Sequence, residues 1–163
     1  MMQSIIDGII RIMADGLVVP IVLIAGWAMI WKVPKNARFE RVARGVVAGL
    51  IALFLAKVLS LTYQEGARPF VELGVQAKAA YLNNPGFPSD HVLFVFCITF
   101  VVWASTKSKK ICLTLLALSV LVALGRILAL VHTPLDVLGG FACALVAVSV
   151  VYGRSFYTSR LPR

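Results

Sequence analysis

Five long apolar stretches constrain this chain more than any other feature. They cover approximately residues 16–31, 43–63, 91–105, 111–131 and 134–152. Hydrophobic residues make up 60% of the sequence and charged residues only 14%, whereas about 25% of a typical soluble domain is charged. A soluble fold of 163 residues cannot bury so much apolar surface, and a membrane-spanning helix needs about 20 apolar residues. The sequence therefore predicts an all-α integral membrane protein, a helical bundle of five to six transmembrane helices in one domain.

Residues 1–15 precede the first stretch and fit two arrangements. Apolar side chains recur there at a roughly helical spacing, at Ile5, Ile6, Ile9, Ile10 and Met13. Such a segment could extend the first span, or it could lie flat in the membrane interface as an amphipathic helix. Both arrangements stay open from the sequence.

The basic residues are distributed unevenly between the two ends of the expected spans. One side receives eleven of the 16 Lys and Arg residues with Glu40 as its one carboxylate, and the other receives five basic and six acidic residues. Because cytoplasmic loops are rich in Lys and Arg, this predicts a cell-membrane protein with a cytoplasmic C-terminus and the loop 64–90 outside. Aromatic residues are expected to form an interfacial belt at the cytoplasmic ends, at Trp31, Trp103 and Tyr152.

Some partners are disfavoured by the same pattern. The net charge of +9 follows the positive-inside distribution, so nucleic acid is not expected as a partner. Three cysteines, Cys97, Cys112 and Cys143, lie inside apolar stretches without metal-ligand spacing. We expect them to be small packing residues.

A short polar segment precedes the third apolar stretch, and it has two interpretations. It runs Pro85-Gly86-Phe87-Pro88-Ser89-Asp90-His91. Ser89 is a natural N-cap and Asp90 is favoured by the helix dipole, which explains both residues structurally. The same free N–H groups at a helix start also suit a phosphate, and His91 would then hold a proton above it.

A second polar segment joins the last two stretches. Thr133 can cap the last helix with Asp136 in a capping-box arrangement, and Asp136 can also hold the ring of His132. Arg126 could extend outward to water or point into the bundle toward an anion. Arg68 adds another cation at this membrane face. Two arginines argue against a zinc site formed by the histidines and an aspartate, so no metal or other cofactor is expected.

Three motifs occur in order along this outer face: Arg68-Pro69, then Pro88-Ser89-Asp90-His91, then Arg126-x5-His132-x3-Asp136. Together they resemble the signature of the type-2 phosphatidic acid phosphatases, the PAP2 superfamily, whose pattern is K-x6-R-P, P-S-G-H and S-R-x5-H-x3-D. The resemblance covers about residues 57–140. The aspartate of the second motif and the run Arg-Pro-Phe-Val at 68–71 are most similar to its bacterial undecaprenyl-pyrophosphate phosphatases.

The resemblance implies a metal-independent lipid phosphatase that works through a phosphohistidine. His132 would be the nucleophile, Asp136 would orient it, and His91 would protonate the leaving group. The phosphoryl oxygens would be held by Arg68, Ser89 and Arg126.

This sequence departs from the family pattern at three positions. The lysine expected seven residues before Arg68 is Leu61, and Lys57 lies one helical turn earlier, from where it could reach the phosphate site. Asp90 replaces the family's glycine within the phosphate-binding motif. Gly125 replaces the serine before Arg126 and removes one hydroxyl.

The expected substrate is a lipid phosphate or diphosphate reached from the bilayer. A polyprenyl diphosphate, hydrolysed at the extracytoplasmic face to the monophosphate, is favoured. Phosphatidylglycerophosphate, phosphatidic acid or another envelope lipid phosphate is the alternative within the class. A non-catalytic membrane protein, in which the buried Arg and His residues line an ion path, is the alternative outside it.

Overall fold

The computed structural model describes residues 2–63, 66–82 and 86–158, with side chains described as far as residue 153. Its helices, in chain order, are α1 (Met2–Arg11), the π-helix η1 (Ile12–Gly16), α2 (Val18–Trp31), α3 (Lys35–Thr62), α4 (Pro69–Glu72), α5 (Asp90–Thr106), α6 (Lys109–Leu128) and α7 (Pro134–Thr158). The predicted all-α membrane bundle is confirmed. Pro85, at the start of the polar segment before the third apolar stretch, and Arg160 and Arg163, among the basic residues near the C-terminus, lie outside the described part of the chain.

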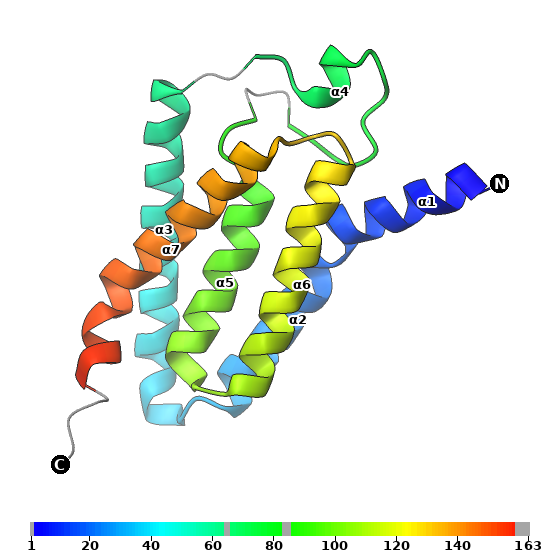
Figure 1. Cartoon of the computed structure of the whole chain (residues 1–163). Coiled ribbons are helices and arrows are strands. Elements are labelled where there is room, and N and C mark those ends of the chain that lie inside the picture. Colours follow the sequence, from blue (N-terminus) through cyan, green and yellow to red (C-terminus); the bar gives the residue numbers. More distant parts are fainter. Residues whose placement is uncertain (1, 64–65, 83–85, 159–163) are drawn as a thin grey trace.

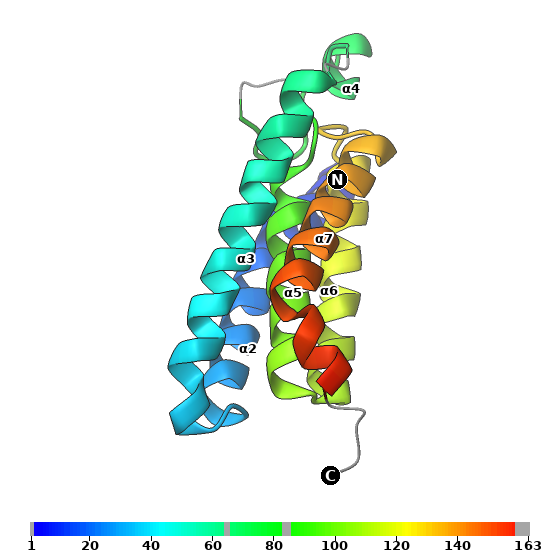
Figure 2. The ribbon, with the colours of Figure 1, turned by 90° about the vertical axis from the view of Figure 1, so that its left-hand side faces the viewer.

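The bundle is organised around α5. Within the described part of the chain, four segments are long and apolar enough to cross a membrane: Met2–Trp31, Lys35–Thr62, Lys109–Leu128 and Pro134–Gly153. The 17-residue α5 is shorter, and it packs against α2, α3, α6 and α7 (Figures 1 and 2). Because neighbouring helices surround α5, its apolar side chains are spread around most of its circumference instead of forming one stripe.

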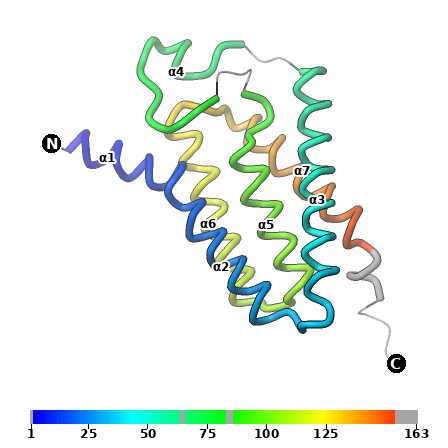
Figure 3. The backbone as a smooth tube through the Cα atoms, turned by 180° about the vertical axis from the view of Figure 1, so that it is seen from behind, coloured from blue at the N-terminus to red at the C-terminus, as the bar shows by residue number. Residues whose placement is uncertain are grey.

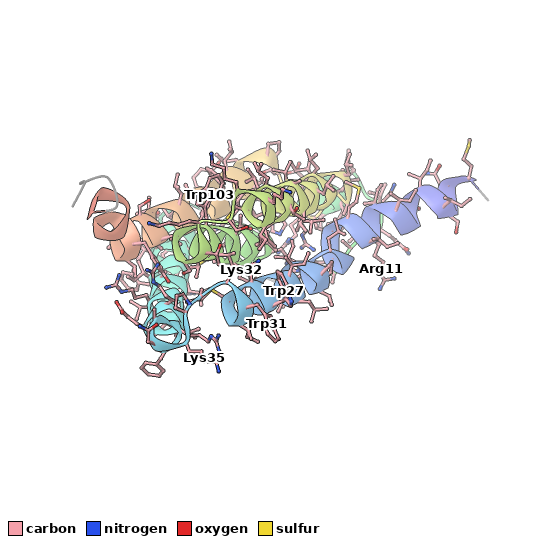
Figure 4. The ribbon with its side chains drawn as sticks, turned by 90° about the horizontal axis from the view of Figure 1, so that it is seen from below. Arg11, Trp27, Trp31, Lys32, Lys35 and Trp103 are labelled. Carbon is pink, nitrogen blue, oxygen red and sulfur yellow. The ribbon has the colours of Figure 1, made fainter. Side chains whose placement is uncertain are left out.

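The two ends of the bundle differ in chemistry. The loops that follow α3 and α6 meet at one end, together with α4 and the start of α5 (Figure 1). The α2–α3 and α5–α6 connections lie at the other end, where Trp31, Lys32, Lys35 and Trp103 are found (Figure 4). The alternation of spans and loops thus brings the polar motifs together at the end opposite the basic loops, as the sequence predicts.

At the basic end, α3 is tied to its neighbours through its backbone and one arginine. Arg41 donates from Nη1 to the carbonyl of Ala104 at 3.0 Å, and the hydroxyl of Tyr152 donates to the carbonyl of Arg41 at 2.7 Å. Tyr152 is fully buried, so its predicted place in a lipid-facing aromatic belt is wrong. Trp31 and Trp103, 71% and 39% exposed, retain the exposure that such a belt requires.

Residues 2–11 turn away from the bundle axis. The helix α1 diverges from the other helices at the end that carries the polar loops, as seen from both sides (Figures 1 and 3). Ile5 and Ile9 on this helix are more than half exposed. The π-helix η1 forms the bend, and it packs against α6.

Glycines in α7 allow that helix to approach the start of α5. A Cβ atom added to Gly140 would lie 2.5 Å from the carbonyl oxygen of Ser89, and one added to Gly139 would lie 2.7 Å from the ring of Phe87. These distances are too short for any side chain. The pair Gly139-Gly140 therefore sets how closely the second and third motifs lie.

We expect Gly140→Ala to lower the free energy of unfolding by about 1–3 kcal/mol, because backbone must move to admit the methyl group. Gly26→Ala is the matched control, since a Cβ there has no atom within 4 Å and alanine favours a helix. Thermal unfolding in detergent measures both. Equal melting temperatures for the two variants would contradict the close packing at Gly140.

Candidate active site

A cavity of about 150 Å³ lies at the end of the bundle where the motifs meet. Its lining comes from the loop after α3, the start of α5, the last turn of α6 and the α6–α7 turn, and consists of Arg68, Ala80, Tyr81, Leu82, Asp90, His91, Arg126 and His132. Residues from all three sequence motifs therefore share one cavity.

The turn between α6 and α7 presents His132. Nδ1 of His132 lies 3.3 Å from Oδ2 of Asp136, and the backbone N–H of Thr133 donates to the same oxygen at 2.8 Å. The N–H of Asp136 donates to Oγ1 of Thr133 at 3.2 Å, which completes the predicted capping box. One carboxylate thus caps α7 and holds the imidazole ring.

Burial decides the charge state of this ring. His132 is 5% exposed, and burial lowers its pKa below the ordinary value of 6.5, an effect that the hydrogen bond to Asp136 partly opposes. The neutral form is therefore favoured at neutral pH. With the proton on Nδ1 facing Asp136, Nε2 keeps its lone pair and can act as a nucleophile.

Arg126 points into the bundle. Its side chain is 1% exposed in the last turn of α6, and Nη1 donates to Oδ1 of Asp15 at 2.7 Å. Its Nε has no hydrogen-bond partner among the residues that the structure describes. The sequence leaves two orientations open for Arg126, outward to water or into the bundle, and the structure has the second. In this orientation the charged Nε–H group is available to an anion.

Arg68 supports the loop as well as lining the cavity. Nη1 donates to the carbonyl of Val131 at 2.6 Å, and Nη2 donates to the carbonyl of Leu82 at 3.0 Å. Its guanidinium carbon lies 5.5 Å from the ring centre of Tyr81. Partial burial lowers the pKa of Arg68 from its ordinary value, although an arginine remains charged at neutral pH. Arg68 thereby fixes the residue that precedes the nucleophile candidate.

Ser89 occupies the predicted N-cap position of α5 without acting as a side-chain cap. Its hydroxyl makes no capping hydrogen bond, is fully buried, and has no partner among the described residues. Its backbone N–H donates to the carbonyl of Asp136 at 2.9 Å. A buried hydroxyl without a partner is costly, which favours the interpretation in which this helix start binds a ligand oxygen. Asp90 follows as the first residue of α5.

Two residues differ from the prediction for this site. Lys57, which the sequence places near the phosphate, does not line the cavity, and Asp15, which belongs to none of the motifs, contacts two residues that do. Lys57 is exposed on α3 and is not part of the lining. Asp15, on η1, pairs with Arg126 and lies 3.6 Å from Nε2 of His91. The sequence does carry one signal for Asp15. It is a carboxylate at the edge of an apolar stretch, and ionisable residues at such positions are rare and functional.

The donor set suits an anion better than a metal ion. Among the residues with described positions, no three His, Cys, Asp or Glu side chains gather closely enough to hold a metal. Two arginines instead supply positive charge, and the two histidines supply further hydrogen-bonding groups. Arginine and backbone N–H groups at a helix start are typical phosphate ligands.

We expect Ser89→Ala to keep or raise the melting temperature, because the buried hydroxyl makes no capping bond whose loss would cost about 1 kcal/mol. The same variant should weaken binding of vanadate, a phosphate analogue, about tenfold, since it removes one hydrogen bond to a charged ligand. Ser105→Ala, buried near the opposite end, is the control and should change neither quantity. Unaltered vanadate affinity in Ser89→Ala would exclude the hydroxyl from the anion site.

The sequence of this chain is similar to those of known proteins. The sequence model of the family described as "PAP2 superfamily" matches residues 41–160. The chain is 30% identical over 131 residues to "Putative undecaprenyl-diphosphatase YbjG" of Escherichia coli (strain K12), covering 79% of this chain and 62% of that protein. It is 28% identical over 131 residues to "Bacitracin transport permease protein BcrC" of Bacillus licheniformis, covering 80% and 63%. The chain thus spans about three fifths of the length of these relatives. No solved structure matches it.

Proposed function

Because this chain belongs to the PAP2 superfamily, we propose that it is a membrane lipid phosphatase that hydrolyses a polyprenyl diphosphate to the monophosphate through a phosphohistidine. The observation that carries the proposal is the pairing of a buried, carboxylate-held His132 with His91 and Arg126 in one cavity. A nucleophile, a proton donor and an anion ligand are the groups that phosphoryl transfer requires.

In the first step, Nε2 of His132 attacks the terminal phosphorus. An N–P bond forms while the bond from phosphorus to the bridging oxygen breaks, and His91 gives its proton to that oxygen. The lipid monophosphate leaves. Arg126, Ser89 and Arg68 hold the three equatorial oxygens, whose charge-assisted hydrogen bonds stabilise the transition state more than the ground state.

In the second step, water attacks the phosphorus of the phosphohistidine. His91, now neutral, takes a proton from the water, the N–P bond breaks, and inorganic phosphate leaves. Asp136 stabilises the positive charge that His132 carries while it is phosphorylated. Each atom in this cycle is supplied by the substrate, by water or by the chain, and no step of the proposed cycle uses a metal ion.

An apolar hollow supports a lipid as the substrate. It has a volume of about 490 Å³ and is lined by side chains of α2, α3 and α5, all of them apolar or glycine. Two of its lining residues, Leu93 and Phe94, lie two and three residues after His91 on α5. A hydrocarbon tail in this hollow would place its phosphate near the polar end of the bundle.

Two further observations support the substrate and the membrane face that we propose. One of the two relatives is named as an undecaprenyl-diphosphatase, which favours a polyprenyl diphosphate over phosphatidylglycerophosphate or phosphatidic acid. The cavity lies at the end opposite the Lys- and Arg-rich loops. By the positive-inside rule the site faces the extracytoplasmic side of the cell membrane, and the C-terminal residues lie in the cytoplasm.

We expect His132→Ala to abolish phosphate release from undecaprenyl diphosphate without changing the melting temperature, because the nucleophile is lost. His91→Ala should reduce turnover strongly for the lipid and least for p-nitrophenyl phosphate, whose leaving group needs no proton.

EDTA should leave the wild-type rate unchanged. Full activity in His132→Ala would overturn the mechanism, and loss of activity with EDTA would favour a metal hydrolase.

The role of the hollow is tested by filling it. Gly49→Phe places a ring where a Cβ has no atom within 4 Å, so the bundle can accept it. We expect KM for undecaprenyl diphosphate to rise about tenfold or more, while hydrolysis of water-soluble p-nitrophenyl phosphate stays near normal. Gly153→Phe, in open space on α7, is the control. An unchanged KM in Gly49→Phe would place the lipid tail elsewhere.

A further inference from the structure

Asp15 reaches the cavity from a part of the chain that carries none of the three motifs. It lies on η1, and its Oδ1 is 2.7 Å from Nη1 of Arg126 and 3.6 Å from Nε2 of His91. Its second oxygen, Oδ2, accepts a hydrogen bond from the backbone N–H of Ala80 at 2.9 Å. Both oxygens are therefore fixed, by groups on α6 and in the loop that follows α4.

The close contact between η1 and α6 depends on Gly125. A Cβ atom at this position would lie 2.5 Å from the backbone nitrogen of Ala14 and 2.7 Å from the carbonyl carbon of Met13. A serine, which the family pattern has here, would therefore collide with the backbone of η1. Gly125 therefore allows η1 to pack closely against α6, and this packing places Asp15 beside Arg126.

The carboxylate offsets the cost of a buried arginine. Arg126 is 1% exposed in the last turn of an apolar helix, and an uncompensated charge there would be strongly destabilising. Because Asp15 engages Nη1, the plane of the guanidinium is fixed and the Nε edge stays available. A planar donor group held in this way loses less freedom when it binds phosphate.

The same oxygen acts on His91. Four side chains with charged or titratable groups surround that ring, namely Arg126, His132, Asp15 and Asp90. Asp15 lies within ion-pair distance of Nε2. Each histidine of the cavity thus has its own carboxylate, Asp136 for His132 and Asp15 for His91.

We propose that Asp15 is a positioning residue that fixes the guanidinium of Arg126 and supports the protonated ring of His91 through one carboxylate oxygen. The inference rests on the proposed function, since it assigns a task in phosphoryl transfer. It makes the N-terminal helical segment part of the active site. In a site that lacks the family's first-motif lysine, Asp15 preorganises Arg126, one of the two arginines that line the cavity.

Asp15→Asn tests this with little change in shape, because the amide oxygen can still accept hydrogen bonds. We expect kcat for undecaprenyl diphosphate to fall about 10- to 100-fold, since the general acid loses its charged support. The fall in kcat for p-nitrophenyl phosphate should be much smaller. Asp7→Asn removes a carboxylate from the same segment, where it pairs with Lys78 outside the cavity, and should behave as wild type.

Asp15→Glu restores the charge and moves it by one methylene, so its kcat should lie between those of wild type and Asp15→Asn. If Asp15→Asn does not fold, Asp15→Glu carries the same test, and its kcat must fall more for the lipid than for p-nitrophenyl phosphate. Equal losses on both substrates, or wild-type kcat, would overturn the proposal. A lower KM with unchanged kcat would also overturn it, because Asp15 would then compete with phosphate for Arg126.

The proposed function and this inference fail in different ways. Wild-type protein that releases no phosphate from any lipid would count against the proposed function. Wild-type protein that turns over the lipid, with Asp15→Asn equally active, would count against the role of Asp15 alone.

Discussion

One backbone hydrogen bond joins the two histidine motifs, and the site depends on it. The N–H of Ser89, at the start of α5, donates to the carbonyl of Asp136, in the first turn of α7, at 2.9 Å. The bond can form only because Gly140 lets the two helix starts approach to a distance that no side chain permits. His91 and His132 are thereby fixed in one small cavity, although they lie far apart in the chain.

Charge balance inside an apolar bundle explains the rest of the arrangement. The charge of the buried Arg126 is compensated by Asp15 on η1. The ring of the buried His132 is held by Asp136 on α7. The pairing leaves particular donors without protein partners, Nε of Arg126 and the hydroxyl of Ser89 among the described groups. Such groups are costly where nothing binds them, and a phosphoryl group would satisfy them. The site is thus held rigid by its own carboxylates, and its unpaired donors remain available to a ligand.

Local signals in the sequence were sufficient for the helices, the polar end of the bundle and the capping box of Thr133 and Asp136, because apolar runs and short-range spacing determine them. They were not sufficient for Asp15, whose contact with Arg126 joins residues 111 positions apart through a bend at η1. Tyr152 was misplaced in the lipid-facing belt because an aromatic residue at a helix end can face either lipid or a neighbouring helix. Only the packing of α7 against α3 decides between them.

Transfer of a phosphoryl group to His132 is the step on which the proposed mechanism depends. Undecaprenyl diphosphate labelled in its terminal phosphate, mixed with the protein and quenched within milliseconds, tests it most directly. We predict label on His132, stable in alkali and lost in acid, formed equally with EDTA present and missing from His132→Ala. Phosphate release by the wild type with no labelled intermediate, or with label on another residue, would contradict it.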